Sequence, residues 1–555
     1  MPFKFRFRSK KKARNDLLLQ ILEDFDDQAL CRVSGVCQRL HRVSLYALFS
    51  RHCPDLLTAG CLKLKNHPPL LLPALHSALF ISKDTPLSIH VQFDRAIPCF
   101  ISELYLLSRL MKRTSRLSSI NLDLQNLHYE YNYPALPVLR DEIVSFLELA
   151  VACGCKSLTV SQGQPLLEVF RRRWCPSKMP GRRTIEERPE EIERSPKEPI
   201  RVPVKLKQRK NSALQSLHLY GALLFEPAFL DHTLSFCNNL QITELWITSL
   251  TCRTDAWIDF FSRVTMPALK TFMLDANYTD NTFARFLRRH SETLESLSVI
   301  LSGPRDNLSA SIPFPSESNR YNFTFSKLHR LTGHMSFLER FLTSCLTTSE
   351  RQHALACLPS LRSVLINVDL NSKNPILSYI RITETLNSIA RIENFNHNRA
   401  ELARNASVLR GLSPGRSDSG TDSEMRSWVR RLEINPVTPD IILPWLNVQL
   451  KKSWATLTFH SVEELYVNSS KDLGDGFFEV LPQFCSQFPN IKLLKFNSDS
   501  EGLKKRKTGD WEDLKGVCPH LKHVSVLGKF FLEMDDLING HWLPAHDSAI
   551  SIDIL

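Results

Sequence analysis

Side chains that could perform catalysis or bind a metal are plentiful in this 555-residue chain, but they do not fall into a recognisable spacing. The sequence has no GxSxG nucleophile elbow, no HExxH zinc motif and no glycine-rich phosphate loop. The eighteen histidines are scattered, and the nearest approach to a paired cysteine motif is Cys153-Gly154-Cys155, without a second pair or a histidine cluster. We therefore expect no catalytic centre, metal or cofactor, and we expect that the chain is not an enzyme.

A short strand-like motif of the form LxxLxL offers a different kind of site, because it recurs along the chain. Its clearest copies begin at Leu214, Ile242, Leu269, Leu294, Leu361, Val429, Val462, Ile491 and Leu521, and weaker copies begin at Leu87 and Leu117 and lie around Leu158 and Leu331. The motif leucines should point into a core, and the residues between them should face an open surface, because side chains alternate along a strand.

This open surface is where we expect a protein partner to bind, since exposed aromatic side chains on a rigid face are good anchors. The candidate substrate-binding residues are His218, Tyr220, Trp246, Thr248, Met273, Tyr466, Asn468 and Lys495.

The elements that position these residues resemble leucine-rich repeats. Most neighbouring copies lie 25 to 33 residues apart, and the intervening segments carry apolar residues at helical spacing. Such a repeat implies a solenoid in which each strand lines a concave sheet and each helix returns on the outer face. Several helices end in a cysteine that we expect to be a buried core residue, namely Cys155, Cys237, Cys357, Cys485 and Cys518.

Three short amphipathic helices are predicted between Asp16 and Phe49. The Asp26-Asp27 pair offers an N-cap for the second of them. A unit this small buries little apolar surface, so part of its apolar surface is expected to be left for a partner. The apolar stripes are formed by Leu17, Leu18, Ile21, Leu22 and Phe25, then Ala29, Leu30, Val33, Val36, Cys37 and Leu40, then Val43, Tyr46, Leu48 and Phe49.

The segment Val33-Ser34-Gly35-Val36-Cys37 is similar to the second helix of an F-box, and the leucine-rich first helix and the acidic turn resemble that family too. Family members usually open with Leu-Pro, where Ala13-Arg14 stands here, and usually close with Trp, where Phe49 stands. The resemblance implies docking to the Skp-type adaptor of a cullin-RING ubiquitin ligase. The candidate adaptor-binding residues are Leu17, Leu18, Ile21, Leu22, Val33, Val36, Cys37 and Leu40.

The formal net charge of +12 is concentrated in two segments, so the rest of the chain is not basic. Residues 1–14 carry seven Lys or Arg and no acid, and residues 171–210 carry fourteen Lys or Arg against six Glu. Both segments are expected to be disordered, as a basic tail and a basic insertion. Further loop insertions are expected near residues 301–320 and 371–427.

One loop motif, Asp418-Ser419-Gly420-Thr421-Asp422-Ser423, resembles the DSGxxS phosphodegron. The resemblance implies regulatory phosphorylation at Ser419 and Ser423, which would add negative charge in a flexible loop. An ordinary solvated loop remains the alternative.

The sequence therefore predicts an α/β protein with a small N-terminal three-helix F-box-like module (residues 15–52) followed by an irregular leucine-rich-repeat solenoid (residues 53–170 and 211–555). Its expected function is substrate recognition for an SCF-type ubiquitin ligase in the cytoplasm or nucleus, with an unknown protein as the substrate. A non-ligase leucine-rich-repeat scaffold is the alternative. Binding to nucleic acid is less favoured because no array of stacking aromatics accompanies the basic segments, and no membrane partner is expected because no apolar run is long enough to span a bilayer.

Overall fold

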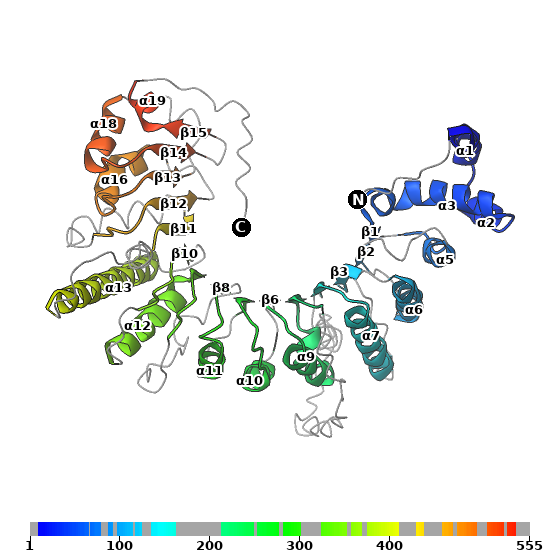
Figure 1. Ribbon diagram of the computed structural model, residues 1–555, viewed down its shortest axis with the longest axis horizontal. Coiled ribbons are helices and arrows are strands. Elements are labelled where there is room, and N and C mark those ends of the chain that lie inside the picture. The colour runs from blue at the N-terminus through cyan, green and yellow to red at the C-terminus, as the bar shows by residue number, and fades with distance from the viewer. Residues whose placement is uncertain are drawn as a thin grey trace, which may run out of the picture. The chain divides into compact units, whose positions relative to one another are not determined.

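The chain divides into two compact units, Met1–Leu269 and Lys270–Leu555, each built from strands that alternate with helices (Figure 1). The structure, a computed structural model, describes residues 9–65, 67–78, 87–92, 97–114, 117–124, 135–161, 213–248, 252, 254–276, 281–300, 324–351, 357–368, 375–409, 429–437, 458–469, 474–496, 508–526 and 530–539.

The first unit opens with three helices, α1 (Ser9–Glu23), α2 (Asp27–Ser34) and α3 (Gln38–His52). The predicted N-cap of the second helix is confirmed, since Asp26 Oδ1 accepts a hydrogen bond from the Ala29 backbone N–H at 2.6 Å. Cys37 caps α3 in the same way, because its Sγ lies 3.5 Å from the Leu40 N–H. These N-caps allow α2 and α3 each to start within a few residues of the end of the preceding helix.

The rest of the first unit repeats a strand and a helix. The strands pair in parallel in chain order, from β1 to β6. In Figure 1 the helices lie on one side of these strands. The elements are α4 (Pro54–Ala59), β1 (Cys61–Leu64), α5 (Leu71–Ser77), β2 (Leu87–Gln92), α6 (Ile97–Arg113), β3 (Leu117–Asp123), α7 (Ala135–Ala152), β4 (Ser157–Ser161), β5 (Ser216–Tyr220), the 3-10 helix η2 (Leu223–Phe225), α9 (Pro227–Asn239), β6 (Glu244–Thr248) and α10 (Thr254–Arg263).

The second unit continues the same pattern, with parallel pairing in chain order from β7 to β14 and one antiparallel strand, β15, at the end. The elements are β7 (Thr271–Asp275), α11 (Asn281–Arg289), β8 (Ser296–Ile300), β9 (Arg330–His334), α12 (Met335–Arg351), β10 (Ser363–Asn367), α13 (Pro375–Leu409), β11 (Arg431–Val437), β12 (Glu464–Ser469), α16 (Gly474–Cys485), β13 (Leu493–Phe496), α18 (Thr508–Val517), β14 (His523–Val526), β15 (Phe530–Glu533) and α19 (Met534–Ile538).

The strands expected from the LxxLxL motif are confirmed, together with the alternation of their side chains. In β5, for example, Leu217 and Leu219 are buried, whereas Ser216, His218 and Tyr220 are half-buried on the other face. We call that second face, opposite the helices, the open face of each sheet. Each unit is thus a solenoid-like α/β repeat whose core lies between the sheet and its helices.

The five helix-end cysteines are buried as predicted. Burial raises the pKa of Cys155, Cys237 and Cys357 to about 12, which keeps these thiols neutral and unreactive. They fill the turn between helix and strand.

Two expectations are corrected by the structure, and two strands were not predicted. Residues 375–409 form the helix α13 instead of part of a long loop, because Ile382, Leu386 and Ile389 recur at helical spacing and are buried. The basic tail is shorter than expected, since residues 9–14 belong to α1. The strands β1 and β15 were not among the predicted copies of the LxxLxL motif. The insertions at 171–210 and 301–320, and the pair Ser419 and Ser423, lie outside the described residues.

Candidate functional site

The N-terminal helices are held together by a charged side chain at the end of α3. The Arg51 guanidinium donates hydrogen bonds to the carbonyls of Leu22 (3.2 Å) and Phe25 (2.6 Å), and also to that of Glu23. A cation at these carbonyls satisfies groups that the end of α1 leaves without intrahelical partners. Asp27 of α2 lies 3.6 Å from Arg51 and 2.8 Å from His52 Nε2. The last turn of α1 is therefore fixed against α3, which Asp27 in turn joins to α2.

The first of these helices turns apolar side chains toward solvent. Leu17 is 60% exposed and Ile21, one turn later, is 51% exposed. Val36, between α2 and α3, is 70% exposed, and Phe25 is 36% exposed. The core of the unit does not cover these side chains, so each of them is available to a protein partner.

The other predicted adaptor-binding residues are placed differently. Cys37 is exposed, whereas Leu18, Val33 and Leu40 are half-buried. Leu22 is the exception, because it is only 3% exposed and packs inside the unit, so it supports the helix rather than presenting a contact surface. Phe49, the last residue of the third predicted apolar stripe, is fully buried.

Three predicted substrate-binding residues meet on the open face of the first unit, and we call His218, Tyr220 and Trp246 the aromatic cluster. The His218 ring stacks on Trp246 with centroids 4.4 Å apart and planes at 12°, and it meets Tyr220 edge-on at 6.4 Å. This follows from the register, which pairs His218 of β5 directly with Trp246 of β6. Thr248 lies beside Tyr220 in the same ladder.

The polar groups around His218 are not arranged as a catalytic triad. Ser216 Oγ lies 2.8 Å from Nε2, but Glu244 Oε1 approaches the same nitrogen at 3.8 Å instead of orienting the opposite one. Nδ1 faces Thr159 Oγ1 at 3.5 Å. Burial lowers the pKa of His218, and the carboxylate of Glu244 offsets this only in part, so the ring is neutral at pH 7. The arrangement fits a neutral contact surface.

A second group lies on the open face of the second unit, and we call Arg431, Tyr466 and Lys495 the cationic cluster. The Arg431 guanidinium carbon lies 4.1 Å from the centre of the Tyr466 ring, and Lys495 Nζ lies 5.3 Å from it. These residues come from β11, β12 and β13, which are neighbouring strands. Tyr466 was expected to be an exposed anchor, but it is only 9% exposed because both cations cover it.

Sequence reasoning overlooked part of both clusters. Arg431, Glu433, Ser216 and Glu244 were not among the candidates, although Ser216, Glu244 and Arg431 occupy the third position of an LxxLxL copy. The alternation that selected His218 also places that third position on the open face. Of the remaining candidates, Asn468 contacts Glu433, and Met273 lies on β7 of the second unit, outside both clusters.

Within the part of the chain that the structure describes, no group of three or more His, Cys, Asp or Glu side chains is arranged to hold a metal ion. Among the described helices, none combines the length and the apolar character that crossing a bilayer requires.

No family model matches the chain, and no curated protein matches it either.

Proposed function

We propose that this chain is the substrate-recognition subunit of a cullin-RING (SCF-type) ubiquitin ligase. In this proposal the F-box-like helices α1 to α3 dock a Skp-type adaptor, and the open faces of the leucine-rich-repeat sheets bind a target protein. Ubiquitin transfer would belong to other subunits, so the role requires no catalytic residue in this chain. The free thiols of the described cysteines suit a complex that works in the cytoplasm or nucleus.

The observation that carries the proposal is the exposure of Leu17 and Ile21 on an anchored helix. They lie four residues apart on α1, so they share one face. Arg51 fixes the last turn of that helix against α3, so this face is presented in a defined orientation. Apolar residues at this spacing are how helices dock into a partner's groove.

Copurification with the adaptor tests the proposal. The full chain and a purified Skp-type adaptor should elute together from a size-exclusion column. The double variant Leu17→Asp with Ile21→Asp should lose this complex, because a charge buried in an apolar contact without a partner is strongly unfavourable.

A matched control exists on α13, where Ile380 is 45% exposed and Leu402 is 60% exposed. The double variant Ile380→Asp with Leu402→Asp changes the same residue types at similar exposure and should leave the complex intact. If the wild-type chain elutes apart from the adaptor, the ligase proposal is wrong.

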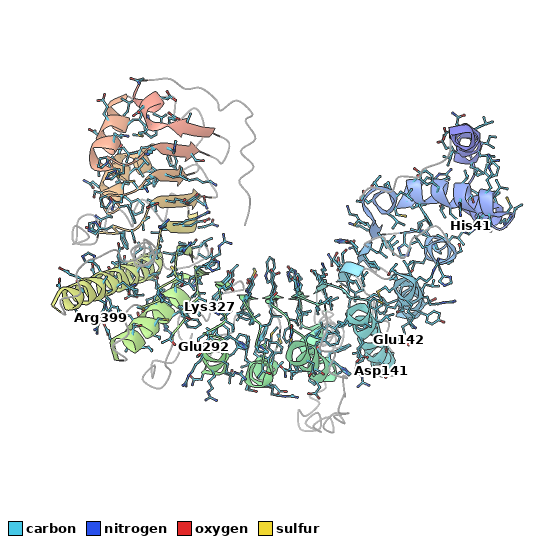
Figure 2. All side chains as sticks on the ribbon, viewed as in Figure 1. His41, Asp141, Glu142, Glu292, Lys327 and Arg399 are labelled. Atoms are coloured by element: carbon cyan, nitrogen blue, oxygen red, sulfur yellow. The ribbon has the colours of Figure 1, made fainter. Side chains whose placement is uncertain are left out.

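A leucine-rich-repeat scaffold or interaction protein without a ligase is the second candidate, and one observation favours it. His41, labelled in Figure 2, places Nδ1 3.1 Å from the Ser34 carbonyl and Nε2 3.1 Å from the Ser77 carbonyl. It therefore ties the N-terminal helices to α5 of the following repeat. Helices joined in this way also suit an N-terminal cap on a solenoid. Under this candidate the exposed face of α1 would not recruit the adaptor.

A further inference from the structure

On the open face of the second unit, the positively charged Arg431 is more exposed than Glu433, the carboxylate that pairs with it. We propose that the cationic cluster, extended by Arg330, binds an acidic segment of a protein partner rich in Asp and Glu. This inference names the chemistry of the target and rests on the proposed target-binding role of the open face, but it does not depend on adaptor docking.

The two carboxylates near the cluster are already engaged within the sheet. Glu433 accepts hydrogen bonds from Arg431 Nη2 at 3.2 Å and from Asn468 Nδ2 at 2.6 Å, one on each oxygen. Glu464 Oε2 accepts a hydrogen bond from the Tyr466 hydroxyl at 3.2 Å. These contacts hold both carboxylates against the sheet, so part of their acceptor capacity is used within this chain.

The positively charged side chain of this ion pair is more exposed to solvent than the negatively charged one. The Arg431 side chain is 37% exposed, whereas that of Glu433 is 13% exposed. Solvent therefore meets the cation before the carboxylate. An approaching group experiences the outer charge more strongly, because the attraction weakens with distance and with hydration.

Two further cations on this face stand without a carboxylate partner among the described residues. Arg330 is exposed, and Lys495 is half-buried beside Tyr466. Neither takes part in an ion pair with any described Asp or Glu. Arg330 lies on the same ladder as Arg431, because both pair with Ser363 of β10. The positive groups thus extend over the strands from β9 to β13.

The spacing of the strands sets the length of the partner. Four strand intervals of roughly 4.8 Å separate β9 from β13, so the cations span about 19 Å. An extended chain rises about 3.3 Å per residue, so roughly six residues cross the same distance. An acidic hexapeptide is therefore the shortest segment that reaches Arg330, Arg431 and Lys495 together.

A protein partner fits this surface better than a nucleic acid. The aromatic ring at the centre, Tyr466, is covered by Arg431 and Lys495, so no ring face is open for a base to stack on. Carboxylate side chains need only the donors and positive charge that the cluster offers.

The test uses the full chain and a fluorescein-labelled hexaglutamate peptide, with a hexaglutamine peptide as the neutral comparison. Fluorescence anisotropy should show binding of hexaglutamate and none of hexaglutamine, and the binding should weaken as salt is raised from 0.05 to 0.5 M. The double variant Arg330→Glu with Lys495→Glu should lower the affinity about tenfold or more, since each reversal replaces an attraction by a repulsion.

The matched control is the double variant Arg391→Glu with Arg399→Glu, which changes the net charge equally. Both arginines lie on α13, and Figure 2 labels Arg399 on that helix, away from the strands. This variant should bind hexaglutamate as the wild type does, and circular dichroism should show that both variants keep their secondary structure.

Three results would overturn the inference. They are no binding of hexaglutamate by the wild type, unchanged binding in the Arg330→Glu with Lys495→Glu variant, or equal loss in both double variants. None of these bears on adaptor copurification, so the inference and the ligase proposal can fail separately.

Discussion

The aromatic cluster of the first unit and the cationic cluster of the second unit occupy equivalent positions on the same kind of scaffold, yet their chemistry is opposite. In the first, a neutral His218 stacks on Trp246. In the second, Arg431 and Lys495 cover Tyr466. The repeat fixes where side chains point, because burial leaves every second strand residue on the open face. The repeat does not restrict which residue types occupy these positions, which suits a surface that recognises more than one feature of a partner.

The largest expected effect tests whether the two scaffolds are equivalent. Leu245 under the aromatic cluster and Leu465 under the cationic cluster are both fully buried. Replacing either with Ala should cost about 2–5 kcal/mol, because it removes buried apolar surface and leaves a cavity. Hydrogen exchange of the strand amides measures each loss, and a cost for one leucine several times that for the other would break the comparison.

A smaller effect should distinguish the carboxylates of the two clusters. Glu433→Gln weakens the charged hydrogen bond from the Arg431 guanidinium. Because Glu433 is largely buried but Arg431 is partly exposed, we expect a loss of about 1 kcal/mol. Glu244→Gln changes only a 3.8 Å approach to the neutral His218, so its cost should stay within about 0.5 kcal/mol.

Denaturant unfolding, monitored by hydrogen exchange of the amides in each unit, measures the stability loss of each variant separately. Similar costs for Glu433→Gln and Glu244→Gln would show that Glu433 is not held as a structural partner of Arg431. In that case Glu433 would face the solvent, and the positive character of the second cluster would be reduced.

The smallest expected effect is a change of stability with pH, and we expect it only in the first unit, which contains the aromatic cluster. Burial lowers the pKa of His218 in the folded chain below its ordinary value of about 6.5. Above that value His218 is neutral in both states and contributes nothing. As the pH falls below it, the unfolded chain binds a proton that the folded chain resists, so the first unit loses stability until the pH reaches the folded pKa.

The difference in unfolding free energy between the wild type and His218→Asn, measured at pH 7.5 and 5.5, isolates this contribution from that of other histidines. The wild type should lose more stability on acidification than the variant. Strands β11, β12 and β13 contain no histidine, so their amide protection should not share the change. An identical acid response in the wild type and the variant would contradict the neutral, buried state of His218.

The sequence predicted the strands well because a buried leucine pattern leaves a parallel strand few alternatives. The third position of each motif copy obeys the same rule, so Arg431 and Glu244 were within reach of the same reasoning. What could not be predicted is which side chains meet. The contact of Arg431 with Tyr466 depends on the register between β11 and β12, and the burial of Tyr466 depends on cations from both neighbouring strands.

The long helix α13 shows the opposite kind of failure. Its polar Asn, Ser and Arg residues gave that region the composition of a loop. Three apolar residues, Ile382, Leu386 and Ile389, are enough to bury one face of it. Local composition was outweighed by packing, which is the usual reason that helix propensity misleads. At the other end of the chain, the exposed face of α1 could be anticipated, but the burial of Leu22 within the same stripe could not.

If this chain joins an adaptor to an acidic target segment, all three should be held in one complex, and a bridging measurement tests this directly. Purified Skp-type adaptor on beads should retain labelled hexaglutamate only when the full chain is added. Retention should be lost with Leu17→Asp and Ile21→Asp at one end, or with Arg330→Glu and Lys495→Glu at the other. Hexaglutamate that binds the chain in solution but never reaches the adaptor beads would contradict the account.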